Sequence, residues 1–524
     1  MLDVLITGGT VIDGSGSPGR AMDVGIVDDR IAAVEPLAGA EAARVIAATG
    51  LVVTPGFIDI HSHSDFTLLV DPRAVSSITQ GVTLEVVGNC GYGCSVIGNP
   101  LLAREAIYGF RSVPPITWRD AGGYLEALHR ARPAINVLTL VPNGQLRLAT
   151  VGLEQRPATA DERARMKWLL EEALDQGAWG YSTGLEYATE VGASEDEVGD
   201  LCRVVAAQDG LYSTHTRNRD EGAVAAVEEA IRTAKQSGVR LQISHLTPRS
   251  GAAPTERAID LVDAARSRSV DVAFDMHTRL FGTTHLKALL PPWALDGGVA
   301  AVRRRLEDSA ARDRMKSFRS VITALGDWGR VVLLDHPVFP RLSRRSFADI
   351  ALELGKDPFD CAYDILLADV EQLQRPMVII HSYTEELLAL TYRHPWCAIG
   401  SDATALAPDG PLADAIFHGA YTWASWFYRR MVRETGLLRP EEAIRRMTGL
   451  PASRLGLSNR GVLRPGAHAD VSMFDPDAFG ETGTTFEPNQ FARGMAHVLV
   501  NGVAALTDGR LTDARGGAVL RRRS

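Results

Sequence analysis

The sequence predicts an α/β protein that combines a (β/α)8 TIM barrel with a small β-sandwich domain built from both ends of the chain. The central part alternates short apolar runs with amphipathic helical stretches, a pattern typical of parallel strands joined by crossover helices. Both ends instead show short strand-like runs separated by Gly and Asp turns. The length of 524 residues suits a large barrel with a smaller module.

The predicted small domain consists of two segments, residues 1–55 and 461–524. Its strand-like runs lie at residues 4–6, 10–12, 24–27, 461–463, 470–474 and 497–500. Because chain termini commonly lie close together, these two β-rich segments predict one discontinuous domain.

The predicted barrel covers residues 56–460. Its opening strand, 57–60, is followed by apolar runs at 83–87, 135–140, 179–182, 211–214, 241–244, 270–274, 378–380 and 397–400, about eight or nine strands in all. Amphipathic helices are predicted at 161–176, 223–237 and 254–267. The Arg-rich stretch from about 280 to 350 is longer than one crossover needs, and we expect it to be an insertion that covers the barrel mouth.

The composition limits the partners and the compartment. A hydrophobic content of 45% and a charged content of 23% are ordinary for a globular protein, and a net charge of −9 argues against nucleic acid. No apolar run approaches ~18 residues, so no membrane span is expected. The chain begins with a strand-like run rather than a signal segment. Five cysteines, an odd number, do not indicate a disulfide framework. These features favour the reducing cytoplasm, and the oligomeric state stays open.

Two histidines stand at the end of the opening strand. His61 and His63 are spaced i, i+2, and successive side chains of a strand alternate faces, so both imidazoles project from one face. Such a pair is placed to bind one metal ion, although alone it fits equally well with two histidines that face water.

Further metal-binding residue types follow other predicted strands. In a TIM barrel, chemistry lies at the carboxyl ends of the strands. Taken singly, each such residue could have a purely structural role, as a buried thiol, as an imidazole in the core or at the rim, or as a helix cap. Their shared position at strand ends favours a metal site, because each offers an N, S or O donor of the kind that binds zinc: Cys90, His215, His245 and Asp402.

The chain resembles the amidohydrolase superfamily and, within it, the N-acyl-D-amino-acid deacylases (D-aminoacylases). The resemblance covers nearly the whole length. The His-x-His strand marks the superfamily, whereas the cysteine turn at 88–91 and the Ser-Thr-Gly-Leu segment are more specific to the deacylases. The matching segments are residues 6–14, 55–65, 88–91, 182–187, 215–217, 243–246, 290–293 and 400–402.

The resemblance implies a zinc-dependent hydrolase. Cys90, His215 and His245 would hold one tightly bound zinc. His61, His63 and Asp402 would line a second, weaker metal position, with Cys90 as a bridge. Many binuclear relatives bridge their metals with a carboxylated lysine, but none of the five lysines here follows a predicted barrel strand in the matching place.

The implied reaction is hydrolysis of an amide C–N bond in a small molecule. Zinc lowers the pKa of a bound water toward ~7. Asp402 would take the proton of that water and return it to the leaving nitrogen. Tyr187 and Arg217 match positions near the substrate. Their alternatives are a packed aromatic ring for Tyr187 and, for Arg217, an ion pair at the surface or just behind the site.

The substrate-recognition segments depart from the family pattern. The deacylases usually carry a lysine two residues after the histidine of the Ile-Ser-His segment, where this chain has Thr247. Arg249 can supply the missing charge if its loop turns inward. The leading substrate is still an N-acyl-D-amino acid or a related N-acyl compound. The alternatives are a cyclic amide hydrolase of the hydantoinase or lactamase kind, which usually needs the carboxylated lysine, and a non-catalytic relative, which typically loses metal ligands.

Overall fold

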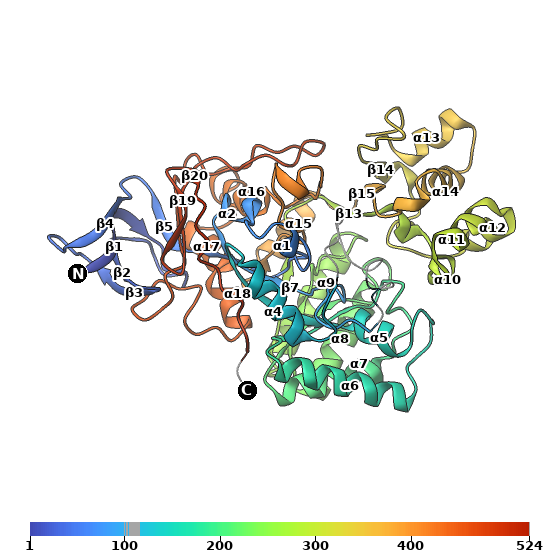
Figure 1. Ribbon diagram of the computed structural model, residues 1–524, viewed down its shortest axis with the longest axis horizontal. Coiled ribbons are helices and arrows are strands. Elements are labelled where there is room, and N and C mark those ends of the chain that lie inside the picture. The colour runs from blue at the N-terminus through green and yellow to red at the C-terminus, as the bar shows by residue number, and fades with distance from the viewer. Residues whose placement is uncertain (99, 101–102, 104–115, 523–524) are drawn as a thin grey trace.

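The computed structural model describes residues 1–98, 100, 103 and 116–522. Figure 1 shows three parts: a β domain at the left that contains the N-terminal strands, a central barrel, and an α/β insertion at the upper right. Among the described residues, no helix combines the length and the apolar character that a membrane span requires.

The central sheet is the predicted barrel. Its eight strands pair in parallel in the order β16-β12-β11-β10-β9-β8-β7-β6. A bridge between Ser62 and Ala403 joins its two end strands, and the His63 amide donates to the Ala403 carbonyl at 2.7 Å. The strands are β6 (Phe57–Asp59), β7 (Val82–Val87), β8 (Asn136–Pro142), β9 (Gly180–Gly184), β10 (Leu211–His215), β11 (Arg240–Ile243), β12 (Val272–Met276) and β16 (Cys397–Ile399).

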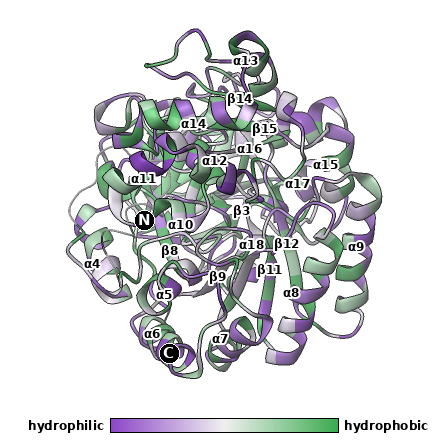
Figure 2. Cartoon of the chain, turned by 90° about the vertical axis from the view of Figure 1, so that its right-hand side faces the viewer, coloured by the Kyte–Doolittle hydropathy of each residue, from purple (hydrophilic) through white to green (hydrophobic). Residues whose placement is uncertain are grey.

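Helices surround the barrel strands. The three predicted helices are confirmed to within two residues as α6 (Ala160–Asp175), α8 (Ala223–Ser237) and α9 (Ala252–Arg266). Helix α6 begins at a capping box, in which Thr159 and Glu162 each accept a hydrogen bond from the other's backbone amide. In Figure 2, β11 and β12 are largely hydrophobic, while α8 and α9 mix hydrophilic and hydrophobic residues, as amphipathic helices around a core do.

The other helices that the structure describes around the barrel are shorter or flank its ends. They are α1 (Thr67–Val70), α2 (Val75–Ile78), α4 (Ala121–Ala131), α5 (Asn143–Thr150), α7 (Glu195–Ala207), α15 (Glu385–Tyr392), α16 (Trp423–Tyr428), α17 (Pro440–Met447) and α18 (Gly449–Arg454), with a π-helical turn at Arg429–Glu434.

Strands from both ends of the chain build one β domain. Its nine strands are hydrogen-bonded in a single sheet, and the two halves of β1 pair with different strands, β4 and β5. Val4, Ile26, Val471 and Leu499 are among the residues of its separate hydrophobic core. The strands are β1 (Leu2–Val11), β2 (Arg20–Val27), β3 (Arg30–Glu35), β4 (Ala42–Ala47), β5 (Val52–Pro55), β17 (Val471–Phe474), β18 (Met495–Val500), β19 (Val503–Thr507) and β20 (Arg510–Leu511).

The insertion is longer than the sequence predicts. The chain leaves the barrel after β12 and returns at β16, and between them a three-stranded antiparallel sheet pairs in the order β13-β15-β14. The prediction that residues 378–380 form a barrel strand is therefore wrong, because they lie in β15 of this separate sheet. The insertion contains β13 (Phe281–His285), α10 (Pro292–Leu295), α11 (Gly298–Glu307), α12 (Ser309–Lys316), β14 (Val331–Leu333), α13 (Phe347–Leu354), α14 (Pro358–Ala368) and β15 (Met377–His381).

Candidate metal centre

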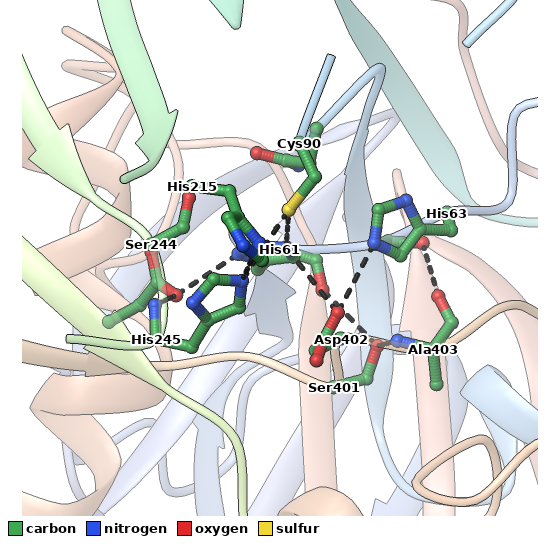
Figure 3. A network of polar contacts seen from close by, with 12 residues as sticks. His61, His63, Cys90, His215, Ser244, His245, Ser401, Asp402 and Ala403 are labelled. Carbon is green, nitrogen blue, oxygen red and sulfur yellow. Dashed lines mark hydrogen bonds and ion pairs between the residues drawn. The ribbon is translucent and has the colours of Figure 1, made fainter. Parts of the chain in front are cut away.

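Six side chains from five barrel strands converge at the mouth of the barrel. His61 and His63 follow β6, Cys90 follows β7, His215 ends β10, His245 follows β11, and Asp402 follows β16. Figure 3 shows these side chains turned toward a common centre. The structure thus brings together all six predicted metal-binding residues.

The Cys90 thiol is the common neighbour of the histidines. Its Sγ lies 3.2 Å from His61 Nε2 and 3.5 Å from His245 Nε2. Interaction with the thiol also contributes to the raised pKa of His63 and of His215. One sulfur surrounded by four imidazoles is a donor set that suits zinc.

The donor atoms form two overlapping groups. Donor atoms of His61, Cys90 and His245 lie within 4.8 Å of one another, and so do those of His61, His63 and Asp402. His61 is shared by both groups. His215, predicted as a ligand of the tight zinc, lies beside the first group, with its Nδ1 3.1 Å from His245 Nε2.

Two of the imidazoles are oriented by carboxylates on their outer side. His61 Nδ1 lies 3.1 Å from Asp275 Oδ1, and His215 Nε2 lies 2.8 Å from Glu186 Oε2. When each ring donates its outer N–H to the carboxylate, its inner nitrogen presents a lone pair to the centre. A metal ion can replace the proton that otherwise lies between these nitrogens and the Cys90 sulfur, so the residues present fit a bound metal.

The electrostatics of the centre favour a thiolate. Burial opposes ionisation of Cys90, but the positive charge of His61 and hydrogen bonds with His215 and His245 hold the pKa of the thiol well below its usual value. The thiolate is the form that ligates zinc. Burial and the charge of Arg219 lower the pKa of His245 to about 4, which keeps this imidazole neutral, as a ligand must be.

Asp402 lies between the histidines and an arginine. Its Oδ1 is 3.2 Å from His63 Nε2, and its Oδ2 accepts a 2.9 Å hydrogen bond from Arg279 Nη2. Burial raises the pKa of Asp402, but His63 and Arg279 outweigh burial and hold it well below the usual carboxyl value. The carboxylate is therefore ionised and able to accept a proton.

Three of the donor residues have strained backbones. Cys90, His245 and Asp402 adopt φ values of 52°, 35° and 45°, in the left-handed region that non-glycine residues rarely occupy. Such strain persists where the surrounding structure enforces it, and it is common at functional sites. It turns each side chain from its strand end into the centre.

A pocket opens above the centre between the barrel and the insertion. Asp402, His215 and His245 line its floor, and Thr283 and Ile380 of the insertion sheet line its wall. Tyr187 and Arg249, both predicted near the substrate, also line it. Their role in substrate binding stays a prediction.

The structure does not bring Arg217 to this pocket. Its guanidinium is held away by Glu229 of α8, with Nη2 2.8 Å from Oε1 and Nε 3.0 Å from Oε2. Two arginines, Arg217 and Arg219, follow β10. Arg219 is the one that lines the described pocket. The position of Arg217 is that of the alternative, an ion pair outside the pocket.

Several residues around the centre were not singled out from the sequence: Glu186, Arg219, Asp275, His277, Arg279 and Tyr383. Asp275 lies at the end of β12, the same strand position that singled out the predicted ligands, so this signal was present. Glu186 lies in the Ser-Thr-Gly-Leu-Glu-Tyr segment at 182–187, which matches the deacylases, so a signal for this residue was present as well. Tyr383 lies just after a strand of the insertion, where a barrel pattern gives no signal.

The fold and the centre together define a metal-dependent hydrolase. A parallel eight-stranded barrel presents imidazoles, a thiol and a carboxylate at its strand ends, next to a pocket for a small molecule. Comparison with known proteins gives the family.

The model of the amidohydrolase family matches residues 44–504. D-aminoacylase of Alcaligenes xylosoxydans xylosoxydans is 33% identical over 99% of this chain and 98% of that protein. N-acyl-D-glutamate deacylase of the same organism is 34% identical over 99% and 97%. The crystal structure of N-acyl-D-glutamate deacylase from Bordetella bronchiseptica, complexed with zinc and a phosphonate mimic of the tetrahedral intermediate, superposes with a TM-score of 0.80 at 32% identity, covering 99% of this chain and 100% of that one.

The chain therefore belongs to the amidohydrolase family. Its nearly full-length match to deacylases that act on carbon–nitrogen bonds identifies it as a metal-dependent amidohydrolase.

Proposed function

We propose that this protein hydrolyses the amide bond of N-acyl-D-amino acids, releasing a carboxylic acid and a D-amino acid. The observation that carries the proposal is the convergence of the Cys90 thiol, four imidazoles and the Asp402 carboxylate at the barrel mouth. The full-length similarity to two named deacylases supports the same reaction.

One zinc would be held tightly by Cys90, His215 and His245, and a second, weaker position would use His61, His63 and Asp402. Support for His215 comes from its contact with Glu186, which directs its Nδ1 toward His245. When bound, zinc polarises an amide carbonyl and lowers the pKa of a water molecule to about 7.

The protein's own contribution to the reaction is proton transfer and orientation. The Asp402 carboxylate accepts the proton of the attacking water and delivers it to the leaving nitrogen. Arg279 keeps this carboxylate ionised and fixes its position through Oδ2, which leaves Oδ1 facing the centre.

The shape of the site favours a substrate with an apolar group. A second chamber shares Tyr187, Thr284 and Val321 with the pocket above the metal centre. Its remaining lining is mainly apolar and includes Leu148, Leu153, Leu290, Leu295 and Phe318. Burial of a hydrocarbon side chain there would contribute roughly 25 cal/mol per Å² of covered apolar surface.

The free thiols support a reducing compartment such as the cytoplasm. All five cysteines are buried and unpaired in disulfides. A metal-binding thiol such as Cys90 stays available as a ligand only while it is reduced.

A substrate screen tests the proposed function. Zinc-loaded protein is incubated with N-acetyl-D- and N-acetyl-L-amino acids, hydantoins and cyclic imides, and acetate release or ring opening is followed. We expect turnover of N-acetyl-D-amino acids with apolar side chains. Ring opening without any acetate release would contradict the proposal and favour a cyclic amide hydrolase.

A further inference from the structure

One arginine at the barrel mouth differs from its neighbours in how its charge is balanced. Three nearby arginines form ion pairs with carboxylates: Arg217 with Glu229, Arg249 with Glu186 and Asp220, and Arg279 with Asp402. Arg219 forms no ion pair with a carboxylate in the part of the chain that the structure describes. It is only 7% exposed and lines the pocket above the metal centre.

The contacts of Arg219 hold it in place without neutralising it. Nη2 donates to the His245 carbonyl at 2.6 Å and to the Tyr383 hydroxyl at 2.6 Å. Nε is buried and has no hydrogen-bond partner among the described residues, and the hydrogen bonds that the guanidinium makes with them all use Nη2 rather than Nη1. A buried guanidinium with unused donors and no carboxylate in direct contact is costly unless an anion joins it.

Tyr383 extends this anion-binding arrangement. Its oxygen accepts the hydrogen bond from Arg219, so its own O–H is available to donate to a second acceptor. The ring also lines the pocket, and its centroid lies 5.5 Å from that of His277. A phenol and a guanidinium side by side can bind two oxygens of one carboxylate.

We propose that Arg219, together with the Tyr383 hydroxyl, binds the carboxylate of the substrate and thereby selects free acids over neutral analogues. The inference rests on the proposed function, because an N-acyl-amino acid supplies that carboxylate. Arg219 is then a specificity-determining residue that contacts the substrate, and its link to the His245 carbonyl fixes the carboxylate relative to the metal centre. Arg249 is less suited to this role, because two carboxylates already offset its charge.

A substrate pair isolates the contribution of the carboxylate. N-acetyl-D-leucine and N-acetyl-D-leucinamide differ only in this group, and acetate release reports the same bond cleavage in both. For the zinc-loaded protein, we expect kcat/KM to be about 100-fold higher for the acid. In Arg219→Met, we expect kcat/KM for the acid to fall about 100-fold, mainly through KM, and that for the amide to change less than about threefold.

Two further variants serve as a control and as a second test of the carboxylate site. Arg232→Met removes an exposed guanidinium that pairs with Glu195 on the outer helices, and it should leave both substrates unaffected. Tyr383→Phe keeps the ring and should lower kcat/KM for the acid about tenfold while sparing the amide. If Arg219→Met does not fold or loses its zinc, the acid and amide kcat/KM values of Tyr383→Phe test the inference in its place.

The outcomes separate this inference from the proposed function. Equal losses for acid and amide in Arg219→Met and Tyr383→Phe, or no loss in either, would overturn the inference while acetate release by the unaltered protein upholds the function. If the unaltered protein releases no acetate from any N-acetyl-D-amino acid, the proposed function fails. Calorimetric titration with D-leucine and D-leucinamide then tests the inference alone: selective binding of D-leucine that Arg219→Met abolishes supports it, and any other result contradicts it.

Discussion

Cys90 is the residue that the four histidines of the centre share. Its Sγ contacts His61 and His245 directly, and the surrounding imidazoles hold it as a thiolate. Cys90→Ser replaces this soft anionic donor with a neutral hydroxyl. We expect zinc affinity to fall at least ~100-fold, measured as zinc content after dialysis against a graded series of chelator concentrations.

A matched substitution controls for the loss of a buried thiol. Cys361 is also buried, but it lies in α14 of the insertion, outside both donor groups. Cys361→Ser should therefore retain zinc as the unaltered protein does. If Cys90→Ser retained zinc equally well, the thiol would not be a ligand of the tight site.

Asp402 is expected to act in proton transfer. Asp402→Asn keeps the size of the side chain but removes the base, so kcat for N-acetyl-D-leucine should fall about 10³-fold. Tightly bound zinc should stay, because Cys90, His215 and His245 are untouched; metal analysis and steady-state kinetics measure the two effects.

The same substitution at an exposed aspartate provides the comparison. Asp409 pairs with Arg73 on the surface, and Asp409→Asn should leave kcat unchanged. Normal turnover in zinc-loaded Asp402→Asn would assign the proton transfer to another group.

Some residues of the site could be predicted from the sequence, and others could not. All six candidate metal donors could be singled out, because each lies at the end of a strand whose apolar pattern is visible in the sequence. The choice between Arg217 and Arg219 could not be predicted, since both follow β10. It depends on Glu229, a helix residue whose carboxylate draws Arg217 out of the pocket.

At the scale of elements, the insertion shapes the space next to the metal centre. Ala288, in the 3-10 turn Leu286–Leu289 after β13, lines the apolar chamber. Ala288→Leu adds three carbon atoms to this wall. We expect kcat/KM to fall about tenfold for N-acetyl-D-leucine and to change little for N-acetyl-D-alanine, because only the larger side chain competes for the filled volume.

The control for this prediction is the same exchange on the outer surface of the insertion. Ala310 in α12 is exposed, and Ala310→Leu should affect neither substrate. Equal losses for both substrates in Ala288→Leu would indicate a disturbed fold rather than a filled chamber.

The elements also explain the one wrong strand prediction. Three consecutive apolar β-branched residues at 378–380 have the same pattern whether they belong to a barrel or to a separate sheet. Only long-range pairing separates the two cases: residue 380 pairs with Gly282 and Val331, and all three segments lie outside the barrel. A local pattern predicts that a strand exists but not which sheet it joins.

At the scale of the whole molecule, a metal at the barrel mouth connects segments that are far apart in the sequence. The donors run from His61 to Asp402, and the bridge between Ser62 and Ala403 joins the end strands beside them. Unfolding separates these donors, so zinc binds the native chain in preference to the unfolded one. The bound ion should therefore stabilise the closed barrel as well as serve the reaction.

Thermal unfolding with and without zinc measures this linkage. With free zinc at about 1,000 times its Kd, binding contributes about 4 kcal/mol, which for a chain of this length corresponds to a rise in Tm of roughly 4 °C. Calorimetric scans of chelator-treated and zinc-reconstituted protein should show this difference. Cys90→Ser should lose most of it, whereas Cys361→Ser should keep it. An equal rise in Cys90→Ser would mean that zinc stabilises the protein from a site other than the barrel mouth.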